Sequence, residues 1–395
     1  MLDAVPASSG GFPVSTCDST LTCAVIDLDA IAHNTHLIRA RVGPSPHLIA
    51  VVKANAYGHG AVPVAQTVLR NGADWLAVGR VCEGLALREA GITAPILILG
   101  YSLPAEAPAA VAANLTLALT ELPVARALAE QARALGREVC VHVKVDTGMG
   151  RFGLLPEEVV PFLDQVAALE GLRVAGLYTH FAAADWADKT PTLAQFARFQ
   201  AVIAAARAAG HELPLCHAAN SSAILDQPEL FLDAVRAGII LYGLFPSRAV
   251  AHDLPLRPAL ALKTHVGRVR TLPAGAGIGY EWTFTTPRPM TAAMISVGYG
   301  DGYPRLFSGQ GAVLINGKRA PIVGRVSMDH FMVDVSDVGP VAVDDEVVLV
   351  GRQGDDVITV EELAGWAGTI NYQIVAGLLP RAVRVYTGEG SSPTG

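Results

Sequence analysis

Short apolar runs alternate with longer segments of helical period over the first two thirds of the chain. Eight runs rich in aliphatic and β-branched residues lie at 47–53, 75–79, 94–100, 115–120, 138–145, 172–180, 213–218 and 234–242. Segments of helical spacing precede and separate them, as at 28–42, 121–136 and 192–209. Apolar strands that alternate with helices are typical of a parallel sheet covered on both faces. Eight such units predict an α/β fold with a (β/α)8 TIM-like barrel over 28–255, and a doubly wound sheet is the alternative.

The pattern changes near residue 255, where helical periodicity gives way to short strands and turns. Strands are expected at 259–271, 291–298, 311–315, 320–327, 331–335 and 346–350, with turn signals at Asn316-Gly317 and Gly354-Asp355. One helix is expected at 360–367. We therefore predict a mostly β C-terminal domain over 256–390. A flexible tail is expected at 1–16, and the sequence leaves open whether a strand within 17–27, at 22–27, joins the β domain.

The composition of the 395-residue chain narrows the class of protein. Hydrophobic residues make up 51% and charged residues 16%, which indicates large buried cores rather than disorder. The net charge of -7 offers no basic surplus for nucleic-acid binding. The sequence shows neither a basic leader nor a membrane-spanning apolar stretch, and we expect a cytoplasmic protein with no nucleic-acid or membrane partner. It has no CxxC pair, and no metal site is predicted.

Polar residues lie where the predicted barrel strands end. They are Lys53 and Asn55 after the first strand, Lys144 and Asp146 at the end of the fifth, His180 at the end of the sixth, Asn220 and Ser221 after the seventh, and Arg236 and Gly238 on the eighth. Charged side chains inside apolar strands are costly unless they are paired or functional. Because active sites of such barrels lie at the carboxyl ends of the strands, the set predicts a polar, functional mouth.

Lys53 and the residues near strands seven and eight together indicate a cofactor. Lys53 follows a buried apolar run, and partial desolvation lowers the pKa of an ammonium group and frees its amine to form a Schiff base. Ser221 begins a helix expected at 221–226, where free N–H groups favour anions, and Gly238 permits close approach of the backbone. A Schiff-base lysine together with one phosphate cradle points to pyridoxal 5'-phosphate.

Nine sequence motifs resemble those of the alanine racemases, barrel-type pyridoxal-phosphate enzymes of fold type III. They are AVVKANAYGHG (50–60), VKVDTGMGRFG (143–153), THFA (179–182), HAANSS (217–222), VRAGIILYG (235–243), GIGYEWTF (277–284), SVGYGDGYPR (296–305), GRVSMD (324–329) and INY (370–372). They follow the family order over nearly the whole chain. The resemblance implies a homodimer with shared active sites, each completed by the partner's β domain.

The resemblance also implies a catalytic role for four residues. Lys53 holds the cofactor covalently and then acts as the base on the Cα face that matches D-alanine. Tyr280 of the other subunit is the base on the opposite face, which matches L-alanine, because a racemase needs acid–base groups on both faces. His180 and Arg236 form a hydrogen-bonded chain behind Tyr280. Arg236 faces the pyridine nitrogen and, since arginine stays protonated, keeps that nitrogen from gaining a proton.

Further implied roles concern the substrate, the phosphate and the entrance. Arg151 binds the substrate carboxylate, helped by the Met328 N–H of the other subunit. Lys144 matches a lysine that the family can carry as a carbamate, an anion able to orient Arg151. The implied cofactor-binding residues beside Lys53 and Arg236 are Tyr57, Ser221, Gly238, Ile239 and Tyr372. Tyr299 and Arg305 are expected at the entrance and in its hydrogen-bonded shell, which Asp329 supports.

The implied function is interconversion of L-alanine and D-alanine by two bases, which supplies D-alanine for peptidoglycan. The sequence leaves two alternatives open: a barrel-type pyridoxal-phosphate amino-acid decarboxylase, and a racemase of broader specificity that accepts serine. Decarboxylases of that group carry a multi-glycine phosphate loop, which the residues after strand seven lack. The choice between alanine and serine depends on a pocket volume that periodicity does not give.

Overall fold

The computed structural model describes residues 20–388, which divide into two compact units. The barrel unit contains Leu28–Ala259 and the short segment Ile370–Ala376. The β unit contains the residues up to Asp27, Leu260–Thr369 and the residues from Gly377 onward. The tail expected at 1–16 lies outside the described residues.

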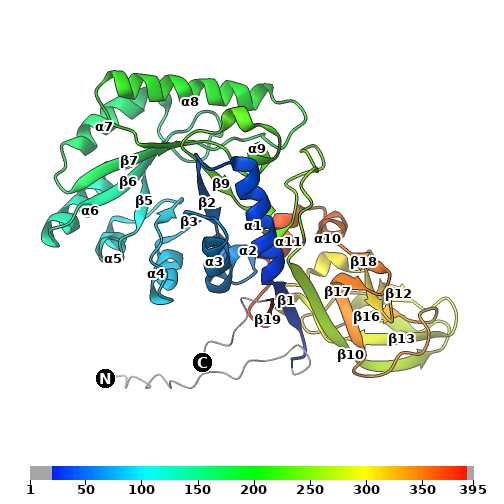
Figure 1. Cartoon of the computed structure of the whole chain (residues 1–395). Helices are drawn as coiled ribbons and strands as arrows, with labels where there is room; N and C mark the ends of the chain where they lie inside the picture. The colour runs from blue at the N-terminus through cyan, green and yellow to red at the C-terminus, as the bar shows by residue number, and fades with distance from the viewer. Residues whose placement is uncertain (1–19, 389–395) are drawn as a thin grey trace, which may run out of the picture. The chain divides into compact units, whose positions relative to one another are not determined.

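Eight parallel strands close into a ring in the barrel unit (Figure 1). They are β2 (His47–Val51), β3 (Trp75–Val78), β4 (Ile96–Ile98), β5 (Thr116–Leu119), β6 (Val139–Lys144), β7 (Leu172–Tyr178), β8 (Leu215–His217) and β9 (Ala234–Ala237). The last strand pairs with the first, from His47 opposite Ala234 to Ala50 opposite Ala237. Each strand overlaps one of the eight predicted apolar runs, and the predicted (β/α)8 barrel is confirmed.

Helices cover the outside of this ring (Figure 1). They are α1 (Leu28–Val42), α3 (Ala61–Arg70), α4 (Val81–Glu89), α5 (Ala107–Ala112), α6 (Leu122–Ala134), α7 (Val159–Ala167), α8 (Thr190–Ala208) and α9 (Ser221–Asp226). The spacing of apolar residues decides which face each helix buries. On α6, Val124 and Leu128 are buried one turn apart, whereas Arg126 and Glu130 are exposed.

The eighth predicted strand is wrong in its second half. The apolar run at 234–242 forms a strand only to Ala237, and Ile239–Tyr242 is a 3-10 helix, η5, that is fully buried. Gly238 lies between them and donates its N–H to Ser221 Oγ at 2.9 Å instead of continuing the strand ladder. A continuous apolar run indicates that a segment is buried, but burial alone does not distinguish a strand from a short helix.

The β unit is built on one sheet of strand order β18-β17-β14-β15-β16-β13-β10-β1-β19. Its strands are β1 (Cys23–Asp27), β10 (Leu260–Leu272), β13 (Met290–Ile295), β14 (Ala312–Ile315), β15 (Lys318–Val323), β16 (Phe331–Asp334), β17 (Glu346–Gln353), β18 (Asp356–Ile358) and β19 (Val383–Thr387). A further pairing of β17 with β10 closes part of this sheet on itself. A small hairpin of β11 (Gly277–Ile278) and β12 (Phe284–Thr285) and the helix α10 (Val360–Ala367) complete the unit. The predicted mostly β C-terminal domain is confirmed.

One hairpin turn and one close backbone contact depend on glycine. Asn316 and Gly317 have φ values of 53° and 73°, as a two-residue hairpin requires, and join β14 to β15 with Ile315 opposite Lys318. Within the barrel unit, α11 (Asn371–Ala376) packs against α2 (Lys53–Tyr57). A Cβ at Gly58 would lie 2.0 Å from the Val375 carbonyl oxygen, so only glycine permits this packing.

Candidate functional site

A cavity of about 680 Å³ opens at the carboxyl ends of the barrel strands. All of its lining residues belong to the barrel unit. Eleven residues singled out from the sequence line it together: Lys53, Tyr57, Lys144, Arg151, His180, Asn220, Ser221, Arg236, Gly238, Ile239 and Tyr372. The polar mouth that the strand ends predicted is therefore present as one cavity.

Lys53 stands at the start of a left-handed turn. The four residues from Ala54 to Tyr57 have φ values between 52° and 54°, a conformation that costs about 1–2 kcal/mol for each L-residue. Glu83 on α4 stabilises the turn, because its Oε1 accepts the Ala54 N–H at 2.6 Å while Oε2 accepts the Gly79 N–H at 2.7 Å. The turn directs both Lys53 and Tyr57 to the cavity. Neither this turn nor the role of Glu83 was predicted from the sequence.

The surroundings of Lys53 favour its neutral amine. Burial lowers the pKa of the Lys53 ammonium, and the positive charge of Arg151 lowers it further. The Glu83 carboxylate acts in the opposite direction and raises the pKa. Since the net shift is downward, a larger fraction of Lys53 is the neutral amine at pH 7 than for a lysine in water, and only the neutral amine acts as a nucleophile or base.

Hydrogen-bond donors converge at the ends of β8 and β9. Tyr57 Oη and Ser221 Oγ both lie against Gly238, where an added Cβ would be 2.8 Å from the tyrosine oxygen and 3.6 Å from the serine oxygen. A side chain at 238 would therefore displace the tyrosine hydroxyl from this position. Burial raises the pKa of Tyr57, which keeps the phenol protonated and able to donate. The Tyr372 ring lies 6.1 Å from the Tyr57 ring, centroid to centroid. Such neutral donors around a small space suit a phosphate group.

Arg236 is the centre of a buried hydrogen-bond chain inside the barrel. Its Nη1 lies 2.7 Å from His217 Nδ1, and its Nη2 lies 3.3 Å from His180 Nδ1 and 2.8 Å from the Thr179 carbonyl oxygen. His217 Nε2 lies 3.0 Å from His142 Nδ1. The Tyr178 ring stacks on His217 with an interplanar angle of 2°. These contacts fix the guanidinium at the floor of the cavity.

The hydrogen bonds around Arg236 determine which ring nitrogen of each histidine carries the proton. A guanidinium can only donate, so His217 Nδ1 and His180 Nδ1 are acceptors and carry no proton. The protons of these two rings therefore lie on Nε2, and His217 Nε2–H donates to His142. Burial and the charge of Arg236 lower the pKa of His142 to about 3 and those of His180 and His217 well below the usual value. All three rings are neutral at pH 7. His142 was not predicted from the sequence, although its place two residues before Lys144 on one strand was a signal.

Lys144 and Arg151 stand at the two ends of one loop. Lys144 Nζ donates to the Phe152 carbonyl oxygen at 2.9 Å, and burial, with the charges of Arg236 and Arg151, lowers its pKa to about 8. Asp146 organises the loop, because its two carboxylate oxygens accept the four consecutive N–H groups from Gly148 to Arg151. Burial raises the pKa of Asp146, but these hydrogen bonds outweigh burial and hold it below its usual value. The loop thereby presents Arg151 at the cavity.

The cavity collects positive charge that is not neutralised by ion pairs. Among residues 20–388, no carboxylate lies within ion-pair distance of Lys53, Lys144, Arg151 or Arg236. The salt bridges in this part of the chain are formed by other arginines, lysines and histidines. Within the same residues, no group of three or more His, Cys, Asp or Glu side chains is arranged to hold a metal ion. Unpaired cations beside neutral donors are an arrangement for binding anions.

The other predicted site residues lie in the β unit on loops joined to one another. Tyr299 N–H donates to the Ser327 carbonyl oxygen at 3.1 Å, which places it beside Met328. Glu281, next to Tyr280, forms an ion pair of 2.9 Å with Arg325 on the segment that leads to Met328. We call the segments 277–283, 298–308 and 324–330 the loop cluster. It carries all five remaining predicted residues: Tyr280, Tyr299, Arg305, Met328 and Asp329.

Large side chains of the loop cluster are exposed in the single chain. Tyr280 is 70% exposed, Trp282 75% and Met328 52%. Exposed aromatic and methionine side chains grouped on joined loops mark a surface for binding or assembly.

In the described part of the chain, 20–388, no helix is long and apolar enough to cross a membrane.

Known proteins resemble both parts of the chain. The model of the alanine racemase N-terminal domain matches residues 26–246, and that of the C-terminal domain matches residues 259–386. The alanine racemase of Symbiobacterium thermophilum is 48% identical to this chain, over 93% of this chain and 97% of its own length. That of Desulforamulus reducens is also 48% identical, over 92% of this chain and 98% of its own length. Alanine racemase of Clostridium difficile superposes with a TM-score of 0.89 at 38% identity, over 94% of this chain and 97% of that one. The Bacillus anthracis enzyme with bound L-Ala-P gives a TM-score of 0.88 at 38% identity, over 94% and 96%.

Proposed function

Because this chain belongs to the alanine racemase family, we propose that its barrel cavity binds pyridoxal phosphate and that Lys53 and Tyr280 are the two bases that interconvert L-alanine and D-alanine. The racemase activity predicted from the sequence motifs agrees with that family. The observation that supports the residue assignment is the convergence of Lys53, Arg236 and the Tyr57–Ser221–Gly238 donors on one cavity.

The residues present fit pyridoxal phosphate. Tyr57 Oη, Ser221 Oγ and the backbone at Gly238 and Ile239 would hold the phosphate, with Tyr372 beside them. Lys53 would bind the cofactor covalently, and Arg236 would meet the ring nitrogen. Pyridoxal phosphate, when bound, supplies an electron sink for the charge that develops at Cα of the amino acid. Arg236 stays protonated even with its pKa lowered to about 10 by burial, so it keeps a proton off that nitrogen and limits the sink.

Two groups would move the proton at Cα. The lowered pKa of Lys53 makes its amine a suitable base on one face. Tyr280 would act on the opposite face, and its hydroxyl needs help because an ordinary phenol has a pKa of about 10. His180 carries its proton on Nε2, since Arg236 holds Nδ1, and could donate that proton in a hydrogen bond to the tyrosine oxygen. Such a bond stabilises the phenolate, which is the form of Tyr280 that accepts a proton.

Substrate binding would use the remaining charges. Arg151 would bind the carboxylate of alanine, helped by the Met328 N–H. A carbamate on Lys144 would convert an ammonium that repels Arg151 into an anion that attracts it. The pKa of about 8 makes this reaction accessible, because the neutral amine is the form that attacks carbon dioxide.

We further infer a homodimer in which the loop cluster of each subunit completes the other subunit's cavity. The exposure of Tyr280, Trp282 and Met328 supports this arrangement, as large apolar side chains on a stable enzyme are usually covered. The D-alanine formed would serve peptidoglycan synthesis, as is general for the family, and the cytoplasmic location expected from the sequence stays a prediction.

The decisive experiment supplies the purified enzyme and pyridoxal phosphate with single L-amino acids in heavy water. We expect D-alanine that carries deuterium at Cα, with serine converted more slowly. Release of carbon dioxide without inversion would make the enzyme a decarboxylase. Bound cofactor without exchange at any Cα would contradict the proposal. Sedimentation equilibrium of the same preparation should give twice the chain mass, and a monomer that racemises alanine would contradict the shared site.

A further inference from the structure

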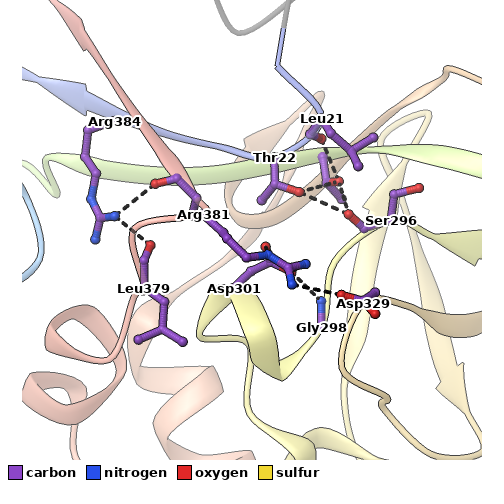
Figure 2. A network of polar contacts seen from close by, with 11 residues as sticks. Leu21, Thr22, Ser296, Gly298, Asp301, Asp329, Leu379, Arg381 and Arg384 are labelled. Carbon is purple, nitrogen blue, oxygen red and sulfur yellow. Dashed lines mark hydrogen bonds and ion pairs between the residues drawn. The ribbon is translucent and has the colours of Figure 1, made fainter. Parts of the chain in front are cut away.

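Arg381 joins two separate loops of the β unit through one guanidinium (Figure 2). Its Nε and Nη2 donate to the two carboxylate oxygens of Asp301 at 3.0 and 3.2 Å. Its Nη1 donates to Asp329 Oδ1 at 2.8 Å. The Asp301 carboxylate is only 6% exposed, and that of Asp329 is about half exposed. A guanidinium that meets one buried carboxylate with two bonds and a second with one holds both in fixed positions.

The two loops that Arg381 joins are the ones that carry Tyr299 and Met328. Asp301 ends the 3-10 turn η7 (Tyr299–Asp301), and its Oδ2 accepts the Gly298 N–H at 2.9 Å. Gly300 N–H donates to the Met328 carbonyl oxygen at 2.9 Å. A Cβ at Gly300 would lie 2.8 Å from Arg381 Nη1 and 3.0 Å from that oxygen. Tyr299, at the start of the same turn, donates its N–H to the Ser327 carbonyl oxygen at 3.1 Å, and that carbonyl belongs to the peptide that carries the Met328 N–H. By holding Asp301 at the end of the turn, the guanidinium limits how this peptide can move.

Arg381 is itself held by the sheet. Leu379 N–H donates to the Asp301 carbonyl oxygen at 3.0 Å, and Val383, two residues after Arg381, begins β19, which pairs with β1. Thr22, just before β1, donates its hydroxyl to the Ser296 carbonyl oxygen at 3.1 Å (Figure 2). The Thr22 and Thr264 hydroxyl oxygens lie 3.0 Å apart. Arg381 lies in the turn directly before β19, and the Val383 N–H that follows donates to the Thr22 carbonyl oxygen at 3.2 Å, so this turn is anchored to the strand pair β1–β19.

We propose that Arg381 is a positioning residue for the substrate, which acts by fixing the Met328 N–H and by neutralising Asp329. The inference rests on the proposed function, in which that N–H meets the carboxylate of alanine. Asp329 is next to Met328 in the chain, so without Arg381 its charge would stand unpaired beside the place where an anion binds. Loss of the guanidinium would loosen the peptide and repel the substrate carboxylate, and both effects weaken substrate binding.

The test compares Arg381→Met with Arg319→Met in the holoenzyme. Arg319 is a matched control, since it also bridges two carboxylates of the β unit, Asp356 at 2.9 Å and Glu362 at 2.8 Å, on segments outside the loop cluster. We expect Arg381→Met to raise KM for both alanine enantiomers about tenfold while kcat falls far less. Arg319→Met should leave KM within about twofold of the wild-type value. The absorbance of the bound cofactor should be unchanged in both.

Equal KM values in the two variants would overturn the positioning role. If Arg381→Met does not fold, Arg381→Lys and Arg319→Lys give the same comparison, because lysine keeps the charge but loses the fork that meets two carboxylates. Hydrogen exchange of the segment 325–330 adds a readout independent of turnover: it should accelerate in the Arg381 variants alone, and unchanged exchange would contradict the inference. A wild-type enzyme that does not racemise alanine would overturn the proposed function instead, and the two failures are thus distinguishable.

Discussion

The barrel cavity and the loop cluster use positive side chains in opposite ways. In the cavity, Arg236 meets neutral partners, two histidines and backbone carbonyl oxygens, and Lys144 meets a carbonyl oxygen. At the loop cluster, Arg381 and Arg325 meet the carboxylates of Asp301, Asp329 and Glu281. A cation already paired with a carboxylate stabilises local structure, whereas a buried cation with neutral partners retains its field for a ligand.

Under the proposed function, this difference separates the region that binds the anionic groups from the region that positions the Met328 N–H and Tyr280. Keeping cations together without counter-charges costs stability, and the lowered pKa values of Lys53, Lys144 and Arg236 express that cost. The neutral histidine chain behind Arg236 reduces the cost of burying this guanidinium, since each ring offers an acceptor without adding charge. The loop cluster needs no such arrangement, because its arginines are already paired with carboxylates.

The largest expected effect comes from removing a cavity cation. Lys53→Ala should lower racemisation by at least about 10³-fold, because both covalent cofactor binding and one base are lost. Lys263→Met is the matched control, since Lys263 lies in the β unit and pairs with Glu346 at 2.8 Å. It should retain nearly full activity in the same assay. Comparable losses in both variants would break the distinction between paired and unpaired cations.

Tyr280→Phe tests whether the loop cluster contributes chemistry as well as shape. Proton removal from L-alanine should fall by about 10²–10⁴-fold, while exchange of the D-alanine Cα proton with solvent should fall less, because Lys53 serves that face. Deuterium incorporation into each enantiomer, measured at early times in heavy water, gives the two rates. Trp282→Phe, a nearby exposed aromatic on the same loop, is the control. Equal losses in both directions would contradict the assignment of Tyr280 to one face.

Glu83→Gln removes the carboxylate whose charge raises the pKa of Lys53. Glutamine has one acceptor oxygen where Glu83 uses two, so the left-handed turn loses support, and we expect kcat to fall about tenfold. Loss of the charge should also lower the pKa of Lys53 further, which moves the acidic limb of the pH–rate profile to lower pH. Glu106→Gln is the control, since Glu106 accepts the Leu103 N–H at 2.7 Å to cap another turn of the barrel unit. An unshifted pH profile in Glu83→Gln would count against this electrostatic coupling.

The smallest effect concerns stability and pH. His142 titrates near 3 in the folded protein and near 6.5 when unfolded, so between these values the unfolded chain binds a proton that the folded chain excludes. The free energy of unfolding should therefore decrease as pH falls below 6.5, and each such histidine contributes at most about 1.4 kcal/mol per pH unit. His142→Gln should reduce this slope in urea unfolding measured between pH 4.5 and 6.5 (about two units). An unchanged slope would show that His142 is not buried in its neutral form.

Several features could be predicted from the sequence because neighbouring residues decide them. Apolar runs of strand length between helical segments indicate buried parallel strands, and the helix at 28–42 agrees with α1 at both ends. Asn316-Gly317 predicted a tight turn because both residues tolerate positive φ. Charged residues placed where those strands end, such as Lys53, Lys144 and Arg236, indicated the cavity, because such a residue is too costly to bury without use.

Other features depend on partners that lie far away in the chain, and periodicity does not reveal these. The left-handed turn after Lys53 persists because Glu83 accepts its N–H, and the end of β9 at Ala237 reflects the contact of Gly238 with Ser221. The pairing of Arg381 with Asp301 and Asp329 likewise exists only after the strands are assembled. Sequence patterns record burial and local conformation, whereas hydrogen bonds and ion pairs form between whichever groups the fold brings within about 3 Å of one another. The sequence by itself therefore determined the barrel, the β domain and the cavity residues, and the tertiary structure decided how those residues are held.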